Sequence, residues 1–453
     1  MKKNKGILNG SVVLGVGAFI SKLLGAIYRI PLTNLIGGTG LGLYQMVFPV
    51  YAVLLDFSGA GVPSALSRII SANTSENKYV YAENYLKSSL RLFKVIGLVG
   101  LILMVIFSRS FATIQGNEKA FASYVAIAPA IFLVSLISCY RGYFQGLMNM
   151  QPTAVSQITE QAIKLCFGLT FAYLFRRSIP LAVTGATFAI TLSELGAFIY
   201  LYVKHKRFKI KLLPTFIFDR ENHSQRVKEV IKTTIPITFI GIIIPLSQVI
   251  DSFIIINVLN GYRQDATALY GLLSGVAATV VGLPVSVCYG ISTVAIPAVS
   301  SSKTERQKNK NAMKALLLTF AVALPCALVC YLFAPTIISI LFRRLPASEK
   351  EVATNLLRII SPCVVFLSML QTSNAVLIGK SKLYKPMFSL SIGVVVKIVL
   401  SIILLKNQNL NIYGGAIALI ACYFVATLIN FIIIFKLKVN HESKIACRRE
   451  YAS

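Results

Sequence analysis

Nine ionisable side chains lie in stretches that are otherwise apolar enough to cross a lipid bilayer. They are Lys22, Arg29, Asp56, Glu160, Lys164, Glu194, Asp251, Arg358 and Lys397. A charge near the centre of a spanning helix costs roughly 2.5–3.5 kcal/mol, so a membrane protein that keeps several must house them in an internal cavity. Cationic side chains in such a cavity can hold an anion, and carboxylates can hold a proton or a cation.

Small and charged residues share one stripe of the first apolar segment. The stripe comprises Ser11, Gly15, Ala18, Lys22, Gly25 and Arg29, which recur at alternating spacings of four and three. Lys22 and Arg29 therefore point the same way, roughly 10 Å apart along the axis. Lys22 lies deeper and is expected in the cavity. Arg29 either joins it there or reaches the outer membrane interface with its long side chain.

Lys164 and Lys397 occupy matching places in two similar stretches. Gly146-Leu-Met-Asn-Met-Gln-Pro152 is echoed by Gly379-Lys-Ser-Lys-Leu-Tyr-Lys-Pro386, and each lysine lies eighteen residues beyond its glycine. If the repeat is real, the two ammonium groups lie at matching depth and an anionic group such as a phosphate can bridge them. The competing interpretation is that Lys164 pairs with Glu160, four residues earlier on the same helix.

The carboxylates are candidates for a coupling or gating role. Asp56, Glu194 and Asp251 have no partner nearby in the sequence, and Glu160 has only Lys164. A lone carboxylate in an apolar segment must bind a proton or pair with a cation. Asp251 is a candidate partner for Lys22. These acids form either structural ion pairs or a site for a coupling proton or sodium ion. Arg358, near the outer end of its segment, is expected at the membrane interface.

The composition of the 453-residue chain requires a membrane protein to position these groups. Hydrophobic residues make up 56% and charged residues only 13%, and the mean hydropathy is +0.72, which excludes a soluble protein. Twelve segments are long enough to span a bilayer. They are residues 7–30, 43–70, 86–108, 121–146, 153–175, 181–203, 231–259, 267–299, 312–342, 352–378, 386–405 and 412–435.

The placement of the basic residues gives the topology. With the amino terminus inside, 31 of the 45 Lys and Arg residues lie in cytoplasmic segments and 9 in outer ones. This positive-inside pattern predicts that both termini are cytoplasmic. It also accounts for the net charge of +29 without a nucleic-acid partner.

We therefore predict an all-α polytopic membrane protein of twelve transmembrane helices in two six-helix lobes. The expected parts are an N-terminal lobe (1–204), a basic cytoplasmic linker (205–230), a C-terminal lobe (231–437) and a cytoplasmic tail (438–453). Six helices is an even number, so the lobes are parallel repeats with a substrate pathway at their junction. No nucleotide-hydrolysing motif or metal-ligating cluster is apparent. We expect a transporter driven by a gradient, not an enzyme.

The first 70 residues also carry a family pattern. Its pieces are Ser21-Lys-Leu-Leu-Gly25, Tyr28-Arg-Ile-Pro-Leu32, Ile36-Gly37, Gly40-Leu-Gly-Leu-Tyr44, Pro49-Val-Tyr51 and Gly59-Ala-Gly-Val-Pro-Ser-Ala-Leu-Ser67. This pattern resembles the stage V sporulation protein B and polysaccharide-biosynthesis branch of the multidrug/oligosaccharidyl-lipid/polysaccharide exporter superfamily. The resemblance continues more loosely as Arg141-Gly-Tyr-Phe-Gln-Gly146.

The resemblance implies a flippase for undecaprenyl-pyrophosphate-linked sugars, such as the peptidoglycan precursor lipid II, in the bacterial cytoplasmic membrane. A cationic cavity in this family receives the pyrophosphate, which implies that role for Lys22. Flippases of the branch often have fourteen helices, the last two forming a lipid-tail groove, so the expected twelve leave other lipid-linked glycans or drugs open.

The leading hypothesis is alternating-access export of a lipid-linked oligosaccharide, with the diphosphate held by Lys22, Lys164 and Lys397 and assisted by Arg29. We expect no cofactor beyond a coupling ion, and a monomer whose partners are the glycan substrate and membrane lipids. The alternatives are a cation-coupled multidrug exporter of the same fold and a scramblase-like or scaffold protein whose charges only hold helices together.

Overall fold

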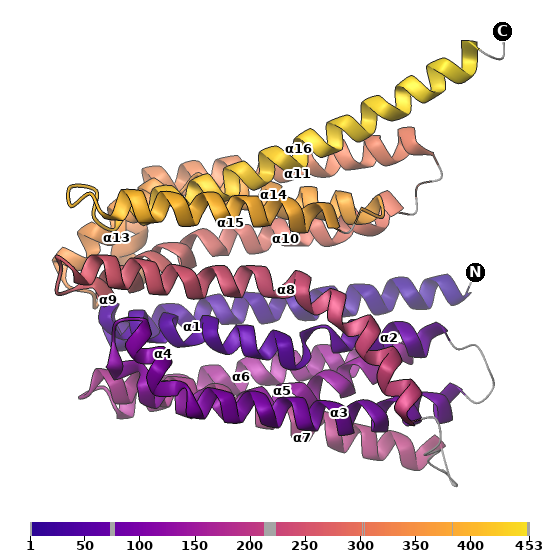
Figure 1. Cartoon of the computed structure of the whole chain (residues 1–453), viewed down its shortest axis with the longest axis horizontal. Helices are drawn as coiled ribbons and strands as arrows, with labels where there is room; N and C mark the ends of the chain where they lie inside the picture. Colours follow the sequence, from indigo (N-terminus) through magenta and orange to yellow (C-terminus); the bar gives the residue numbers. More distant parts are fainter. Residues whose placement is uncertain are drawn as a thin grey trace. The chain divides into compact units, whose positions relative to one another are not determined.

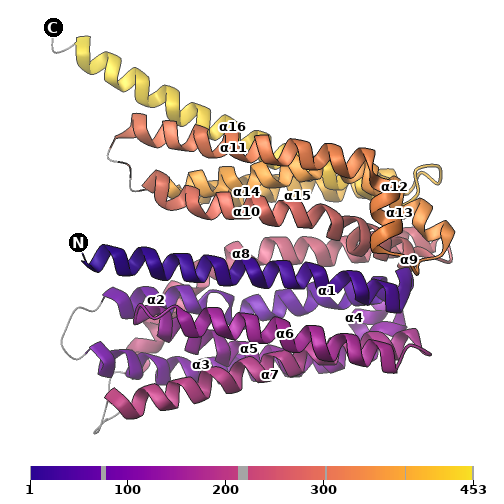
Figure 2. The same cartoon turned by 180° about the vertical axis from the view of Figure 1, so that it is seen from behind.

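The computed structural model describes residues 2–72, 78–212, 223–300, 302, 304–382 and 384–450. The side chains of some helical residues, including Lys22, lie outside the described part. Contacts divide the chain into two compact units, Met1–Phe253 and Ile254–Ser453. Every regular element among the described residues is a helix (Figures 1 and 2), so the all-α prediction is confirmed.

The N-terminal unit contains α1 to α7 and most of α8. These helices are α1 (Lys2–Leu55), the π-helical turn η1 (Asp56–Ala60), α2 (Val62–Ala72), α3 (Lys78–Ile106), α4 (Ser108–Ile114), η2 (Glu118–Ala120), α5 (Phe121–Gly146), α6 (Gln151–Leu174), α7 (Ile179–Leu212) and α8 (His223–Asn260). Within this unit α5 packs against α2, α3 and α7, and α6 packs against α1 and α7.

The C-terminal unit contains the end of α8 and all later helices. These are α9 (Ala266–Gly271), the π-helical η3 (Leu272–Ala277), α10 (Ala278–Ser300), α11 (Glu305–Leu332), α12 (Ala334–Leu341), α13 (Ala347–Ile360), α14 (Cys363–Gly379), α15 (Tyr384–Leu405) and α16 (Tyr413–Glu450). Here α14 packs against α10, α11 and α16, and α15 packs along α16.

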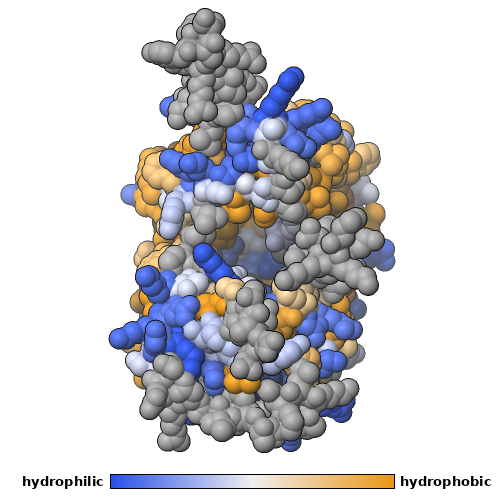
Figure 3. All heavy atoms as spheres, turned by 90° about the vertical axis from the view of Figure 1, so that its right-hand side faces the viewer, coloured by the Kyte–Doolittle hydropathy of each residue, from blue (hydrophilic) through white to orange (hydrophobic). Residues whose placement is uncertain are grey.

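The outer sides of the helices suit a lipid environment. Apolar side chains stay exposed along α11, for example Leu317 at 60% and Leu332 at 64%. Figure 3, an end-on view, shows hydrophilic residues gathered on the helix ends and apolar residues toward the periphery. Among the described residues nine helices are long and apolar enough to cross a membrane, or ten if the bent pair α13 and α14 forms one span. A polytopic membrane protein is confirmed, while the count of twelve stays a prediction.

The unit boundary differs from the expected linker at residues 205–230. The division falls within α8, because the start of this helix belongs by its contacts to the N-terminal unit. His223 Nδ1 lies 2.9 Å from Ser88 Oγ of α3, and Glu229 accepts a hydrogen bond from Tyr85. The basic segment therefore ends in a helix that packs on α3.

Gly37 reverses the direction of α1. Its φ and ψ of 67° and −174° lie in a region that only glycine adopts readily. The chain turns back there toward α2 (Figure 1). Gly40 lets the two arms approach, since a Cβ at that position would lie 2.6 Å from Ile36 Cβ. Helix α1 thus contains both the first predicted transmembrane segment and the start of the second.

We expect Gly37→Ala to destabilise the protein by about 1–3 kcal/mol, the cost of a non-glycine residue in this region. The measurement is thermal unfolding of the detergent-solubilised protein. Gly290→Ala is the matched control, because nothing lies within 4 Å of a Cβ at Gly290 and its φ is ordinary. Equal unfolding midpoints for the two variants would contradict the strained turn.

The sequence repeat corresponds to a repeated backbone turn. After α5, the amides of Met148 and Asn149 donate to the carbonyls of Gln145 and Phe144. After α14, residues 381 and 382 donate to residues 378 and 377 in the same pattern. Met148 and Ser381, each two residues beyond the repeat glycine, both have a φ of 61°. The two stretches have the same local fold, which supports the duplication.

Candidate functional site

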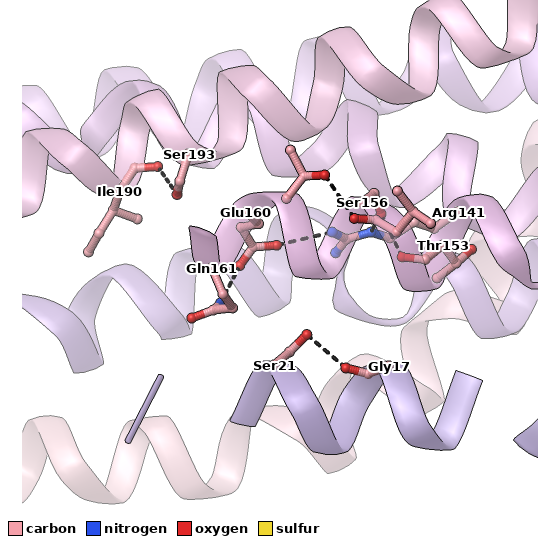
Figure 4. A network of polar contacts seen from close by, with 11 residues as sticks. Gly17, Ser21, Arg141, Thr153, Ser156, Glu160, Gln161, Ile190 and Ser193 are labelled. Carbon is pink, nitrogen blue, oxygen red and sulfur yellow. Dashed lines mark hydrogen bonds and ion pairs between the residues drawn. The ribbon is translucent and has the colours of Figure 1, made fainter. Parts of the chain in front are cut away.

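An ion pair joins α5 and α6 in the interior of the N-terminal unit. Arg141 Nη2 lies 3.0 Å from Glu160 Oε2, with side-chain exposures of 15% and 19%. Arg141 Nε also donates to Ser156 Oγ at 3.0 Å, and this hydroxyl donates to the Thr153 carbonyl. The arrangement arises because Arg141 and Ser156 lie at similar distances before and after the turn at Met148, and Glu160 is one helical turn beyond Ser156. Figure 4 shows the arginine reaching across to both partners.

The network extends along α6 toward α1. Gln161 Nε2 donates to the second oxygen of Glu160 at 3.1 Å. On the facing part of α1, Gly25 leaves space for this amide, since a Cβ there would lie 3.4 Å from Gln161 Oε1. Gly17 also lets α1 approach α6, because a Cβ there would lie 2.8 Å from Ala154 Cβ. Gly25 of the predicted stripe and Gly17, which lies outside the stripe, thus allow close contact with the helix that carries Glu160.

Glu194 of α7 adds a second carboxylate to this region. Its residue is 5% exposed, and its Oε2 has no hydrogen-bond partner among the described residues. It interacts electrostatically with Glu160, Arg141 and Lys164. A buried carboxylate oxygen without a partner is stable only when the group is neutral or when a cation lies beside it. The position is therefore suited to bind a proton or a cation.

Lys164 lies one turn beyond Glu160 on α6 and points at aromatic rings. Its Nζ is 5.4 Å from the ring centroid of Tyr28 and 5.5 Å from that of Phe48, within the range of cation–π contacts. The alternative prediction, an ion pair of Lys164 with Glu160, is wrong: in the part of the chain that the structure describes, the salt bridge of Glu160 is with Arg141. Glu160 instead accepts hydrogen bonds from Arg141 and Gln161, one on each carboxylate oxygen. Arg141 is held in place for this contact by its second hydrogen bond, to Ser156.

Several further polar atoms of α1 and α6 are buried without a partner among the described residues. They are Tyr28 Oη, Tyr51 Oη, Thr153 Oγ1 and Gln157 Oε1. Tyr51 interacts electrostatically with Glu194, Glu160 and Arg141, so it belongs to the same cluster. Buried polar groups are normally satisfied by protein, water or a ligand. This set indicates that the cluster accepts water, an ion or a polar ligand group.

Other predicted site residues lie elsewhere. Arg29 is half-buried next to Tyr28, with which it interacts electrostatically. Asp56 starts the π-helical η1, and a Cβ at Gly241 of α8 would lie 3.6 Å from its Oδ2. Asp251 is half-buried on α8. Lys22 lies outside the residues whose side chains are described, so its cavity role and its pairing with Asp251 stay predictions.

Lys397 occupies the place in α15 that Lys164 has in α6. It is 4% exposed on the buried face that also carries Ser389, Gly393 and Ser401. This face packs on α16, since Ser389 donates to Asn430 Oδ1 at 2.6 Å and a Cβ at Gly393 would lie 2.6 Å from the Cys422 carbonyl. Lys397 also makes polar or electrostatic interactions. Arg358 is exposed in the last turn of α13, outside any such cluster.

The structure thus brings together Glu160, Lys164 and Glu194 and adds Arg141, which was not predicted as a site residue. Arg141 lies five residues from the end of its apolar segment, so the topology count placed it at the cytoplasmic end. A signal was available, because Arg141 is the only charged residue in segment 121–146. An arginine so near a helix end can equally reach the interface, and only the structure shows that it turns inward.

Comparisons with known proteins agree with this architecture. The chain is 28% identical to the lipid II flippase MurJ of Bacillus subtilis over 98% of this chain and 85% of that protein. It is 25% identical to stage V sporulation protein B of the same organism, over 93% and 82%. A solved inward-facing multidrug resistance MATE family transporter of the MOP superfamily aligns with a TM-score of 0.76 at 15% identity, over 93% and 96%. Lipid II flippase MurJ in an inward closed conformation aligns at 0.72 and 16%, over 94% and 87%.

Two family models also match. The MatE model matches residues 236–403, which fits the transporter fold seen in the solved structures. The model described as polysaccharide biosynthesis protein matches residues 7–303, a span that includes α5, α6 and α7 with their buried charges. The match covers well over half of the sequence, and the chain belongs to the polysaccharide biosynthesis protein family.

Proposed function

We propose that this protein is a flippase that moves an undecaprenyl-pyrophosphate-linked oligosaccharide or peptidoglycan precursor across the cytoplasmic membrane by alternating access. The observation that carries the proposal is the cluster of Arg141, Glu160, Lys164 and Glu194 within an otherwise apolar helical unit. Keeping four ionisable groups at such a depth is costly and is typical of substrate and ion pathways. The similarity to a lipid II flippase along almost the whole chain supports the substrate class.

In this proposal Lys164 supplies positive charge to the diphosphate of the head group. It is suited to this role because Tyr28 and Phe48, not a carboxylate, lie against its ammonium group. Among the described residues no carboxylate forms a salt bridge with Lys164, so its ammonium group can accept an anion. Lys22, Arg29 and Lys397 keep the supporting roles that the stripe and the repeat predict for them.

Glu194 is the proposed site of the coupling ion. Release of a proton or sodium ion from this carboxylate changes the net charge beside Arg141 and Lys164, and hence the affinity of the region for an anion. Glu160, Asp56 and Asp251 are the secondary candidates. A cation-coupled multidrug exporter is the second candidate function, because buried carboxylates suit cationic drugs and the MatE model matches part of the chain.

The proposal includes the orientation and the energy source. The positive-inside bias of 31 to 9 supports a cytoplasmic location for both termini. An ion gradient or the membrane potential drives transport, and the protein is not an enzyme. We propose that the protein acts as a monomer.

The test is growth of cells depleted of their own lipid II flippase. We expect the chain to restore growth and Lys164→Ala to fail at normal protein levels. Loss of a hydrogen bond to a charged group weakens diphosphate binding by about 1.5–3 kcal/mol, roughly 10- to 150-fold. Lys119→Ala, which removes an exposed lysine at a helix end, is the control and retains growth.

Two results would contradict this proposal. Normal growth with Lys164→Ala would remove the diphosphate role of this lysine. Failure of the unaltered chain to restore growth, combined with ion-dependent efflux of a cationic drug, would favour the multidrug exporter.

A further inference from the structure

A dense group of basic residues gathers at one end of the C-terminal unit. We call it the basic cluster and define it by its members from the start of α11 and from the turn joining α14 to α15. They are Arg306, Lys308, Lys310, Lys314, Lys380, Lys382 and Lys385. Among the described residues of these two segments, 304–314 and 380–385, the single acid is Glu305. The cluster therefore carries a large local excess of positive charge.

Side-chain contacts hold the two segments together. Lys380 donates a hydrogen bond to Asn309 Oδ1 across the gap from the α14 end to α11. Asn311 anchors the start of α11 by donating to the Ala298 carbonyl and to Ser302 Oγ, both at 3.0 Å. Because α11 also packs along α14, the proximity of the two segments does not rest on this lysine contact alone.

Among the described residues of the two segments, one acid faces seven basic residues. Glu305 is engaged by Lys308 at 2.6 Å. Burial lowers the pKa of Lys380, an effect opposed by Glu305 and reinforced by the like charge of Lys308. Repulsion of this kind is relieved when an anion binds beside the ammonium groups. The geometry therefore provides a place where negative charge is stabilising.

Both segments continue directly into apolar surface. On α11, exposed Met313 and Leu317 follow the lysines, and Leu317 is 60% exposed. On α15, Tyr384 and Phe388, 70% and 58% exposed, lie one turn apart on a common helix face. Aromatic residues next to basic ones are typical of the headgroup level of a bilayer. An amphipathic ligand can place its anionic head on the lysines and its chains along these side chains.

We propose that the basic cluster binds the headgroup of an anionic phospholipid in the cytoplasmic leaflet. The positive-inside topology predicts that both segments face this leaflet, where anionic lipids attract clustered lysines and arginines. The proposal does not depend on the transported substrate. It assigns these residues a specific lipid partner in addition to their effect on topology.

The test is thermal unfolding of the full-length protein in neutral detergent, titrated with phosphatidylglycerol or with phosphatidylcholine of the same chain length. We expect phosphatidylglycerol to raise the unfolding midpoint more, with an advantage that falls as salt increases. Lys308→Gln/Lys380→Gln should weaken the apparent affinity for phosphatidylglycerol about 30-fold, equivalent to about 2 kcal/mol for two charges.

The matched control removes two exposed lysines elsewhere, as Lys119→Gln/Lys406→Gln, and should keep the affinity of the unaltered protein. A loss common to both double variants would show general charge attraction and overturn the specific site. Unchanged affinity in Lys308→Gln/Lys380→Gln would also overturn it. Size-exclusion elution in phosphatidylcholine verifies folding, and Lys382→Gln/Lys385→Gln gives the same test if the first variant does not fold.

Discussion

Replacing Arg141 by alanine should abolish transport and destabilise the protein by about 3 kcal/mol. Removing one partner of a buried ion pair costs about 3–5 kcal/mol because the other charge stays behind uncompensated. The lower end applies here because both side chains keep some exposure. Glu160 would lose its cation, and Ser156 Oγ would lose a donor. Thermal unfolding in detergent and growth of flippase-depleted cells measure the two effects.

The double variant Arg141→Ala/Glu160→Ala distinguishes two effects of losing Arg141: the unpaired charge left on Glu160 and the lost packing of the arginine side chain. It should recover much of the stability, since no charge is left alone, but not the activity. Arg176→Ala is the control, because Arg176 is exposed and lies on the Tyr173 ring, where only a surface contact is lost. If Arg141→Ala unfolds at the same temperature as Arg176→Ala, the ion pair contributes nothing measurable.

Glu194→Gln should uncouple transport from the ion gradient while leaving the fold intact. Glutamine has the same shape and no charge, so it removes the ion-binding group without creating a cavity. A coupling free energy of about 1–3 kcal/mol would be lost, which corresponds to a 5- to 150-fold fall in gradient-driven transport. The measurement is flipping of a labelled lipid-linked sugar in proteoliposomes with imposed proton or sodium gradients.

Glu118→Gln serves as the comparison, because Glu118 is an exposed acid at the start of a short helix. It should retain the full response to the gradient. If Glu194→Gln responds to both gradients as the unaltered protein does, Glu194 is not the coupling site, and Asp56 becomes the next residue to test.

The helices were predictable because the apolar segments are long and their ends are marked by turns and charges. Each of the twelve predicted segments coincides with helical residues of the structure. The repeat was predictable from its glycines, since Gly146 and Gly379 must let α2 and α10 approach closely. A Cβ at Gly146 would lie 2.6 Å from Ile70 Cβ, and one at Gly379 would lie 2.9 Å from Val299 Cβ.

The partners of the charges were not predictable from spacing. The sequence offered Lys164 as the partner of Glu160, because both lie on α6 four residues apart. The structure instead joins Glu160 to Arg141 of another helix, and Lys164 lies over rings from both arms of α1. Which charged residues pair depends on how the helices pack against one another. The hydropathy of the sequence does not reveal that α1 folds back at Gly37. The sequence likewise does not reveal that the start of α8 packs on α3.

The shared turn has a consequence for the history of the molecule. Met148 and Ser381 both adopt a left-handed backbone that non-glycine residues adopt only at a cost. Such a costly conformation at matching places is expected if one half-length sequence gave rise to both halves. Five residues before the two glycines stand Arg141 and Asn374. The first binds a carboxylate, and the second accepts a hydrogen bond from Asn430 at 2.7 Å. Matching places of the two stretches thus carry a charged residue in one and a neutral residue in the other, a difference that a symmetric dimer of identical halves could not have.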